Sequence, residues 1–466
     1  MSRPRDGAAI VAARASVIAS RLTGRHATSI PGVVAERIAP GITRRIAADL
    51  GAVVLVSGTN GKTSTSRFLA HLLEVAGREV IANRSGANLE QAIASTLLAA
   101  ASATGRLRRS GAVAVLEVDE ATLPAVVRKL PVRAVAMTNV FRDQLDRFGE
   151  TDHVIRQWTK MLEGLPVETI VAWCADDPQL ALLMRGRPGS IPYGLVRPEG
   201  TIESAGITTD VSTCPVCSAP LAYAWMAVGH LGDYACTSCD FRRPEPQLLV
   251  RASSRGLDRQ VLVFSRAGTP GEASVEVGFP GLGNAYNATA ALAVATALGV
   301  EMTDAAAALA GVSVPFGRFE ELEIDGRRVV LSLVKNPASF SEVTRIVAGS
   351  TASTILFIFS DNFQDGRDVS WYWDFDPTPM VRERTYVIAG RRATDFQLRL
   401  KYELLAASSD PLPGFLGLAA TPVEGLSQAV GATPPGGTCF VVSTYTALLA
   451  LRATLVARGL APEMPR

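Results

Sequence analysis

The stretch AVVLVSGTNGKTSTSRFLAHLLEV, residues 52–75, decides the fold. It begins with an apolar run, 52–58, that is typical of a buried strand, and it ends in the helical pattern of 65–77. A glycine-rich loop, 58–64, lies between the two. Glycine lets a backbone turn tightly, and the first turn of a helix presents N–H groups that bind phosphate. This order of strand, loop and helix predicts an α/β protein with a phosphate-binding loop.

Every residue of the loop is a candidate phosphate ligand. Lys62 would serve the β- and γ-phosphates, and Thr63 would hold Mg²⁺ through its hydroxyl. The general pattern has a further glycine where this chain has Val56, so the loop is a shorter variant. A plain strand–helix turn with an incidental lysine is the alternative, and the flanking strand and helix disfavour it. The candidate ATP-binding set is Gly58, Thr59, Asn60, Gly61, Lys62, Thr63 and Ser64.

Strand-like and helix-like patterns continue to alternate beyond the loop. The runs 113–120, 133–139 and 169–178 predict buried strands with helical crossovers, and hence a parallel sheet covered on both faces. The strand pattern resumes at 261–268, and a long helix is expected at 284–299.

Polar side chains follow several of these strands. Open α/β sheets bind ligands at the carboxyl ends of their strands, where the Glu117 carboxylate would coordinate Mg²⁺. The segment 138–146 and the pair Asp176-Asp177 follow two further strands. Single polar groups after strands are commonly helix caps, but three such clusters together with a phosphate loop favour one shared site.

Four of the six cysteines lie in a segment of changed composition, residues 208–247. Two C-x₂-C pairs separated by eighteen residues are typical of a zinc ribbon, whose four thiolates surround Zn²⁺ and leave no open position. The zinc is therefore expected to be structural. Disulfides, a redox pair and a nucleic-acid-binding ribbon are the alternatives, which the matched pairs and the few basic residues disfavour. The predicted ligands are Cys214, Cys217, Cys236 and Cys239.

The organisation predicted is a central ATP-binding domain, residues 1–314, that carries the ribbon as an insertion, and a C-terminal α/β Rossmann-like domain, residues 315–466. In the second domain, Asp365 and Asp368 lie in a segment, 360–374, that follows an apolar strand and holds two tryptophans. A polar loop with an aromatic lid is the plain interpretation of that segment.

The composition limits the classes of protein to consider. With 466 residues, 48% hydrophobic and 19% charged, the chain can build large cores and is not a disordered or disulfide-stapled protein. A net charge of +2 argues against nucleic acid as the main partner. No apolar run resembles a signal peptide or a transmembrane segment, so a cytoplasmic protein is expected.

Several motifs, in this order, resemble those of the ATP-dependent Mur ligases and folylpolyglutamate synthases. They are GTNGKTS (58–64), EVDE (117–120), TNVFRDQLD (138–146), ADDP (175–178), GNAYNATAA (283–291) and GRFE (317–320). The resemblance covers about residues 50–340. It implies that ATP phosphorylates a carboxylate and that an amine then attacks the acyl phosphate.

The same resemblance implies roles for individual residues. Lys62 and the loop would hold the phosphates, with Thr63 and Glu117 on Mg²⁺. Asn284 and Asn287 match the adenine-side asparagines of the family, and Arg318 matches its nucleotide-contacting arginine.

This chain departs from the amino-acid-adding members of that family. Gln144 and Gly283 stand where those ligases have histidines, and Lys335-Asn336-Pro337 replaces their His-Asn-Pro. They also carry a carbamylated lysine in the central domain, whereas this chain has no lysine between Lys160 and Lys335.

The segments 360–374 and 389–403 narrow the resemblance to the MurT family, the synthetase subunits of lipid II isoglutaminyl synthase, over essentially the whole chain. This resemblance implies amidation of the D-glutamate α-carboxylate in the lipid II stem peptide, at the inner face of the membrane. Ammonia would come from a GatD-type glutaminase partner. An aspartate of the C-terminal domain would complete the partner's Cys–His pair, with Asp368 favoured and Asp365 second.

Two other functions stay open at this point. One is a Mur or folylpolyglutamate-type ligase that adds an amino acid to a carboxylate, which the departures above disfavour. The other is a zinc-ribbon binding module with a vestigial nucleotide site. The joint presence of Lys62, Thr63 and Glu117 disfavours this second function.

Overall fold

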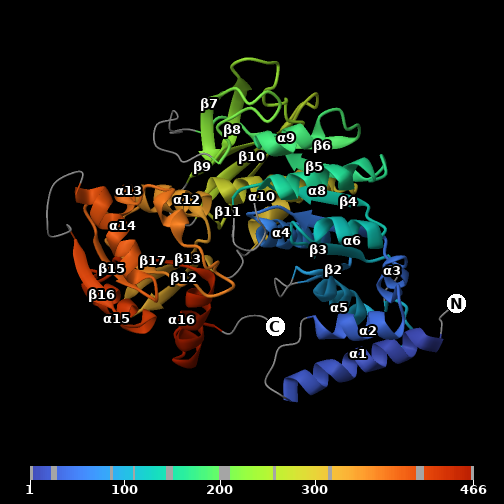
Figure 1. The fold of residues 1–466 in the computed structure, drawn as a ribbon, viewed down its shortest axis with the longest axis horizontal. Helices are drawn as coiled ribbons and strands as arrows, with labels where there is room; N and C mark the ends of the chain where they lie inside the picture. The colour runs from blue at the N-terminus through green and yellow to red at the C-terminus, as the bar shows by residue number, and fades with distance from the viewer. Residues whose placement is uncertain are drawn as a thin grey trace.

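The computed structural model describes residues 4–22, 29–83, 88–108, 111–142, 151–198, 210–254, 259–312, 317–405 and 414–462. Two β-sheets with their helices form two lobes that lie side by side (Figure 1). The central lobe, residues 4–312, is drawn from blue to yellow, and the C-terminal lobe, residues 317–462, is drawn in orange and red. Among the described residues, none of the helices combines the length and the apolar character that crossing a bilayer requires.

Nine strands form the sheet of the central lobe. They are β1 (Ala52–Ser57), β2 (Val80–Ala82), β3 (Val113–Glu117), β4 (Ala134–Met137), β5 (Ile170–Cys174), β6 (Ser190–Leu195), β9 (Leu248–Ser254), β10 (Gln260–Arg266) and β11 (Glu272–Val277). Their order across the sheet is β11-β10-β9-β6-β5-β4-β1-β3-β2.

The predicted parallel sheet is confirmed from β2 to β9, but the two strands at the other edge pair differently. β10 runs antiparallel to both β9 and β11. Only residues 255–259 separate β9 from β10, whereas a parallel crossover needs a dozen or more residues. The short link therefore makes a hairpin, which the apolar run at 261–268 did not reveal.

Helices cover the two faces of this sheet, and further helices form a layer below it in Figure 1. They are α1 (Pro4–Leu22), α2 (Ile30–Ile38), α3 (Ile42–Ala47), α4 (Lys62–Val75), α5 (Glu90–Ala100), α6 (Leu123–Lys129), α8 (Thr151–Glu163), α9 (Pro178–Met184), α10 (Leu282–Ala297), α11 (Met302–Ala308) and the 3₁₀ helix η1 (Leu309–Gly311). The long helix expected at 284–299 is α10. Its many alanines let it pack closely against α4 and the sheet, so most of its residues are buried.

The predicted insertion forms a small separate sheet. Its strands β7 (Leu221–Val228) and β8 (Leu231–Cys236) pair antiparallel with each other alone. The strands that flank it, β6 and β9, pair in parallel within the main sheet. The ribbon is therefore inserted between two neighbouring strands of that sheet, and it lies at the top of Figure 1.

The C-terminal lobe contains a six-stranded sheet between two helical layers. The strands are β12 (Arg318–Ile324), β13 (Arg327–Leu333), β14 (Thr354–Ile358), β15 (Thr385–Ala389), β16 (Phe415–Ala419) and β17 (Thr438–Ser443). The helices are α12 (Pro337–Ala348), η2 (Ser370–Trp373), α13 (Thr378–Val381), α14 (Ala393–Leu405), α15 (Pro422–Ala432) and α16 (Tyr445–Ala457). The strand order is β12-β13-β17-β14-β15-β16, and every pair after the β12–β13 hairpin is parallel.

Alternating side chains of these strands build two cores, one on each face of the sheet. Phe340, Phe357, Phe359 and Phe396 fill one core, and aliphatic residues fill the other. The change from the first sheet to the second falls between η1 and β12. The exact domain limits at 314, 208 and 247 stay predictions.

A buried carboxylate joins the ribbon to the central lobe. Asp176, which is fully buried, accepts hydrogen bonds from Arg243 Nε at 2.7 Å and from the hydroxyl of Tyr286 on α10 at 2.6 Å. Its carbonyl accepts the N–H of Gly232 in the ribbon hairpin, and Leu195 donates its N–H to the carboxylate. One side chain thus holds the ribbon, the sheet and α10 together.

We expect Asp176→Ala to lower the free energy of unfolding by about 3–5 kcal/mol, because it leaves the Arg243 charge buried without its partner. The matched control is Asp240→Ala, which removes an exposed ribbon carboxylate paired with Arg185 and should cost about 0–1 kcal/mol. Urea unfolding of the two variants measures the difference. Equal losses of stability would contradict the role given to Asp176.

Candidate active site at the phosphate loop

The phosphate loop connects β1 to α4, and its path leaves no space for side chains at two positions. Gly58 has a φ of 136° and Gly61 a φ of 86°. A Cβ atom at Gly58 would lie 2.1 Å from the Thr138 hydroxyl, and one at Gly61 would lie 1.9 Å from the Asn287 side-chain oxygen. At these two positions the loop therefore presents only its backbone. It leads into the start of α4, where the first N–H groups have no partners within the helix.

The segment after β4 holds the loop in place. Asn60 donates its N–H to the side-chain oxygen of Asn139 at 2.8 Å, and the Asn60 carbonyl accepts from the Asn139 amide and the Thr138 hydroxyl. Thr59 donates its N–H to the Asn139 carbonyl. Two residues of the predicted polar cluster 138–146 thus position the loop. Its residues 143–146, Gln144 among them, lie outside the described residues.

Lys62 is the first residue of α4, and its ammonium points back over the loop. It donates to the carbonyls of Gly58 at 2.6 Å and Thr59 at 3.2 Å, and it forms an ion pair with Glu120 at 3.0 Å. Burial opposes its charge, but the carboxylates of Glu120, Glu117 and Asp119 together raise the pKa of Lys62 above its ordinary value. Lys62 is therefore protonated at neutral pH.

Glu120 is a residue that the sequence reasoning passed over, because Glu117 stood at the expected strand end. The EVDE motif holds both glutamates, so the signal was present. Glu117 itself is buried at the end of β3, paired in register with Val56 of β1. Its backbone N–H and carbonyl are both bonded to the side chain of Asn83.

The remaining loop residues face the same region. Thr63 is partly exposed, whereas Ser64 is fully buried and its hydroxyl has no hydrogen-bond partner among the residues that the structure describes. The structure thus brings the loop, Thr63 and Glu117 to one edge of the sheet, as the prediction of a Mg²⁺ and phosphate site requires. No observation assigns these residues their ligands, and those roles stay predictions.

The two predicted adenine-side asparagines lie on the first turns of α10, next to the loop. Asn287 accepts from the Thr65 hydroxyl at 3.3 Å, and its amide donates to Asn284 at 3.3 Å. Asn284 in turn donates to the Pro280 carbonyl. The backbone of Arg318 begins β12, but its side chain lies outside the described residues.

A carboxylate from the C-terminal lobe explains one departure from the amino-acid-adding ligases. Glu342 of α12 accepts the N–H of Gly283 at 2.5 Å, at the N-terminus of α10. A Cβ atom at Gly283 would lie 2.5 Å from the Glu342 carboxylate. A histidine at position 283 is therefore incompatible with this contact between the lobes.

The replaced segment Lys335-Asn336-Pro337 also touches the phosphate loop. Lys335 donates its ammonium to the Thr59 carbonyl at 2.9 Å. Asn336 and Asn60 exchange two side-chain hydrogen bonds, at 3.1 and 3.4 Å. Asn336 also caps α12 with Ser339, so the helix fixes its direction. The C-terminal lobe thus brings a second lysine to the loop.

The pair Asp176-Asp177 contacts the ribbon, α9 and the segment after β4. Asp177 caps α9 through the N–H groups of Gln179 and Leu180, and its other oxygen accepts the N–H of Val140. Asp176 is the buried carboxylate that accepts hydrogen bonds from Arg243 and Tyr286. The helix-cap interpretation is confirmed for Asp177, and the expectation that all three polar clusters share one site stays a prediction.

The two candidate aspartates of the C-terminal lobe have different surroundings. Asp365 is buried, accepts from the N–H and hydroxyl of Thr446, and has a pKa raised by its burial. Asp368 is exposed and accepts the Ser370 N–H at 2.8 Å, which lowers its pKa. Of the two, Asp368 is the one whose carboxylate is exposed to a partner.

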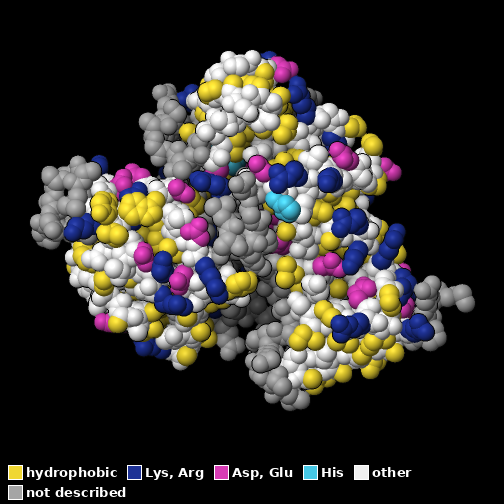
Figure 2. Space-filling model, in the orientation of Figure 1, with side chains coloured by type: hydrophobic (Ala, Val, Ile, Leu, Met, Phe, Trp, Pro, Cys, Tyr) yellow, Lys and Arg dark blue, Asp and Glu magenta, His cyan; other side chains and the backbone are white. Residues whose placement is uncertain are grey.

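Large apolar side chains are exposed near Asp368. Phe363 is 65% exposed, Trp373 52% and Tyr402 62%, and the rings of Trp373 and Tyr402 lie 6.0 Å apart. Figure 2 shows hydrophobic side chains gathered on this side of the lobe, over α13 and α14. Exposed apolar patches of this kind mark interaction surfaces.

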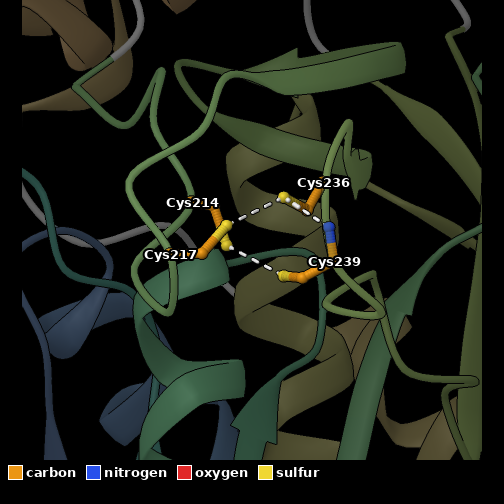
Figure 3. Close-up of side chains that lie close together, drawn as sticks. All are labelled: Cys214, Cys217, Cys236 and Cys239. Atoms are coloured by element: carbon orange, nitrogen blue, oxygen red, sulfur yellow. Dashed lines mark hydrogen bonds between the residues drawn. The ribbon is translucent and has the colours of Figure 1, made fainter.

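The four ribbon cysteines converge (Figure 3), with their sulfur atoms all within 4.8 Å of one another. The Sγ atoms of Cys214 and Cys239 are 3.7 Å apart, and those of Cys217 and Cys236 are 3.4 Å apart. Zn–S bonds in a tetrahedral site imply S···S distances of about 3.8 Å. The cluster therefore fits a tetrahedral metal ion that is closed to further ligands.

The turn of the ribbon hairpin packs on Phe141, which is bonded to the phosphate loop, and on α12. A Cβ atom at Gly229, in the turn between β7 and β8, would lie 2.7 Å from the Phe141 ring and 3.4 Å from Ala338 of α12. The neighbouring His230 is fully buried and packs on Phe141, with ring centroids 4.5 Å apart. The cysteine-rich insertion thus supports the segment that positions the loop.

Two family models match the chain. The Mur ligase middle domain matches residues 56–213, and the MurT ligase C-terminal domain matches residues 333–448. The first matched region contains the phosphate loop, and the second contains Lys335, Asn336 and Asp368.

Curated relatives match over most of the chain. It is 28% identical over 400 residues, 85% of this chain and 88% of the relative, to the lipid II isoglutaminyl synthase (glutamine-hydrolyzing) subunit MurT of Staphylococcus aureus. It is 29% identical over 458 residues, 96% of each chain, to the subunit of the same name from Streptococcus pneumoniae.

Solved structures share the fold. A pseudomurein peptide ligase type C from Methanothermus fervidus gives a TM-score of 0.66 at 18% identity, over 87% of this chain and 78% of that one. MurF from Acinetobacter baumannii gives 0.64 at 17% identity, over 92% of this chain and 81% of that one.

We expect the purified chain to contain one tightly bound zinc ion and Cys214→Ser to lose it, with a lower melting temperature of the ribbon and retained nucleotide binding. Metal analysis and nucleotide titration check the two effects. Ser238→Ala is the control, because it changes an exposed side chain beside Cys236 and keeps the backbone N–H. A full zinc content in Cys214→Ser would contradict this metal site.

Proposed function

We propose, because the chain belongs to the MurT family of Mur ligase-like proteins, that it amidates a carboxylate of lipid II at the expense of ATP. The carboxylate is the α-carboxylate of D-glutamate in the stem peptide, and the product is D-isoglutamine. ATP phosphorylates the carboxylate, ammonia attacks the acyl phosphate, and phosphate leaves. A GatD-type glutaminase supplies the ammonia by hydrolysing glutamine to glutamate.

One observation carries this proposal: the two matched domains build a single site. The Mur ligase middle domain supplies the phosphate loop and Lys62, and the MurT-type C-terminal lobe places Lys335 and Asn336 directly on that loop. A vestigial nucleotide site would have no reason to keep these contacts between lobes. The alternative of an amino-acid ligase has no observation in its favour at Gly283, where the histidine of those enzymes would displace the Glu342 carboxylate.

The loop fits a nucleotide triphosphate with Mg²⁺. Its glycines leave a cradle of backbone, and the start of α4 adds N–H groups and a positive helix end. In the proposed arrangement the loop and Lys62 hold the phosphates, Thr63 and Glu117 hold Mg²⁺, and Asn284, Asn287 and Arg318 contact the nucleotide. When bound there, ATP with Mg²⁺ supplies the phosphoryl group and neutralises its charge.

The chain's own residues then stabilise the negative charge that develops during transfer. Lys62 is held in its charged form by the surrounding carboxylates, and Lys335 brings a second ammonium to the same Thr59 carbonyl that Lys62 contacts. Fixed cations in a partly buried site stabilise such a charge without rearranging. Glu120 keeps the Lys62 ammonium in place until phosphate oxygens compete for it.

The partner is proposed to dock on the exposed apolar patch of Phe363, Trp373 and Tyr402. This surface places the ionised Asp368 carboxylate beside the docked subunit. A carboxylate that accepts a histidine N–H fixes the tautomer of the ring and stabilises its cation, which activates a neighbouring thiol. Because lipid II is membrane-bound, the complex is proposed to work in the cytoplasm at the inner membrane face.

We expect Lys62→Ala to lower amidation by about 10²–10³-fold or more, equally from ammonium and from glutamine, because both routes need the activated carboxylate. Mass analysis of the stem peptide measures the product. Lys160→Ala, at an exposed lysine of α8, is the control and should keep normal turnover. Near-normal amidation by Lys62→Ala, or ligation of an amino acid by the unmodified chain, would refute the proposal.

We expect Asp368→Asn to keep amidation from ammonium and to lose most amidation from glutamine, because only the second route uses the partner's thiol. Asp376→Asn is a close control, since Asp376 is also exposed and accepts the N–H two residues on, Thr378, at 2.8 Å. The ratio of the two rates is the readout. Equal loss of both rates in Asp368→Asn would show that Asp368 does not act on the partner.

A further inference from the structure

Arg142 lies directly after the segment that positions the phosphate loop. The N–H of Phe141 donates to the Thr59 hydroxyl at 3.0 Å, and this hydroxyl donates back to the Phe141 carbonyl at 3.3 Å. The position of Arg142 is therefore set one residue away from a direct contact with the loop.

The side chain of Arg142 contacts two carboxylates from distant parts of the chain. Its N–H and its Nε atom donate to the two oxygens of Asp210, at 3.0 and 2.9 Å, and Asp210 is largely buried at the start of the ribbon segment. Its terminal nitrogen lies 3.6 Å from Asp374 of the C-terminal lobe. Burial disfavours the charge of Arg142, but Asp210 and Asp374 raise its pKa above the ordinary value.

Asp374 is attached to the element proposed to meet the glutaminase. It directly follows η2, and its N–H donates to Trp371 of that helix. Asp368 lies at the other end of η2, where it accepts the Ser370 N–H. One short helix thus carries the partner-facing carboxylate at its start and the Arg142 contact at its end.

An isolated ion pair of this exposure contributes about 0–1 kcal/mol to stability. Arg142 and Asp374 are 39% and 37% exposed, so stability alone gives little reason for the contact. The bond from Nε to Asp210 holds the guanidinium, and the bond from the Arg142 N–H to the other Asp210 oxygen holds the backbone that carries it. A guanidinium held in this way sets where the end of η2 lies relative to the loop.

We propose that Arg142 is a positioning residue that couples glutaminase docking at η2 to the phosphate loop, through its contact with Asp374. This inference rests on the proposed function. The partner hydrolyses glutamine to glutamate and ammonia, and the ammonia forms the amide bond as phosphate leaves the acyl phosphate. The position of the partner's glutaminase site relative to the phosphate loop decides what fraction of the ammonia reaches the acyl phosphate before it escapes to solvent.

The test uses the full chain in complex with its glutaminase, lipid II, ATP and glutamine. Glutamate formed per amide formed is the readout, because a purely structural role would lower both products together. We expect Asp374→Asn and Arg142→Gln to raise this ratio by about two-fold to thirty-fold, the range in which coupling contacts act. Amidation from saturating ammonium should stay within about two-fold of normal by the same range.

Two controls accompany these variants. Asp374→Glu keeps the charge and should restore most of the coupling, while Asp376→Asn removes a nearby exposed carboxylate and should leave the ratio unchanged. An unchanged ratio in both Asp374→Asn and Arg142→Gln would overturn the inference, as would an equal fall of ammonium-driven and glutamine-driven amidation. Failure of the unmodified complex to amidate lipid II from ammonium would instead reject the proposed function itself.

Discussion

The backbone of the phosphate loop passes too close to two neighbouring side chains for any residue but glycine at positions 58 and 61. Thr138 occupies the space beside the first glycine, and Asn287 occupies the space beside the second. The segment of Thr138 also holds the loop by hydrogen bonds, and Asn287 accepts a hydrogen bond from Thr65 in the first turn of α4. The close approach therefore determines how β4 and α10 are placed around β1 and α4.

The C-terminal lobe depends on the same loop. Lys335 and Asn336 bond to Thr59 and Asn60, and Glu342 bonds to the start of α10. Together with the Arg142–Asp374 pair, these contacts close the two lobes over the end of the central sheet. The ribbon adds a third support, because its hairpin turn packs on Phe141 and on α12. The ribbon that carries the four cysteines thus contributes to the site through packing.

Local patterns in the sequence predicted the parts of the molecule that depend on near neighbours. The strand–loop–helix order around Lys62, the paired C-x₂-C motifs and the alanine-rich α10 all belong to this class. Burial by distant residues could not be predicted. Asp365 and Asp368 are three residues apart, and contacts such as that of Asp365 with the distant Thr446 give the two carboxylates different environments. Glu342 opposite Gly283 and Asp374 opposite Arg142 are likewise contacts between the lobes, which no local pattern records.

If the site activates a carboxylate by phosphorylation before ammonia attacks, one oxygen of that carboxylate must leave with the phosphate. The direct measurement uses lipid II whose D-glutamate α-carboxylate is labelled with heavy oxygen, incubated with the chain, ATP, Mg²⁺ and ammonium. With an acyl phosphate as the intermediate, one labelled oxygen leaves in the inorganic phosphate while the other stays in the carboxamide. Phosphate free of label, together with an amidated product, would contradict an acyl phosphate and the mechanism built on this loop.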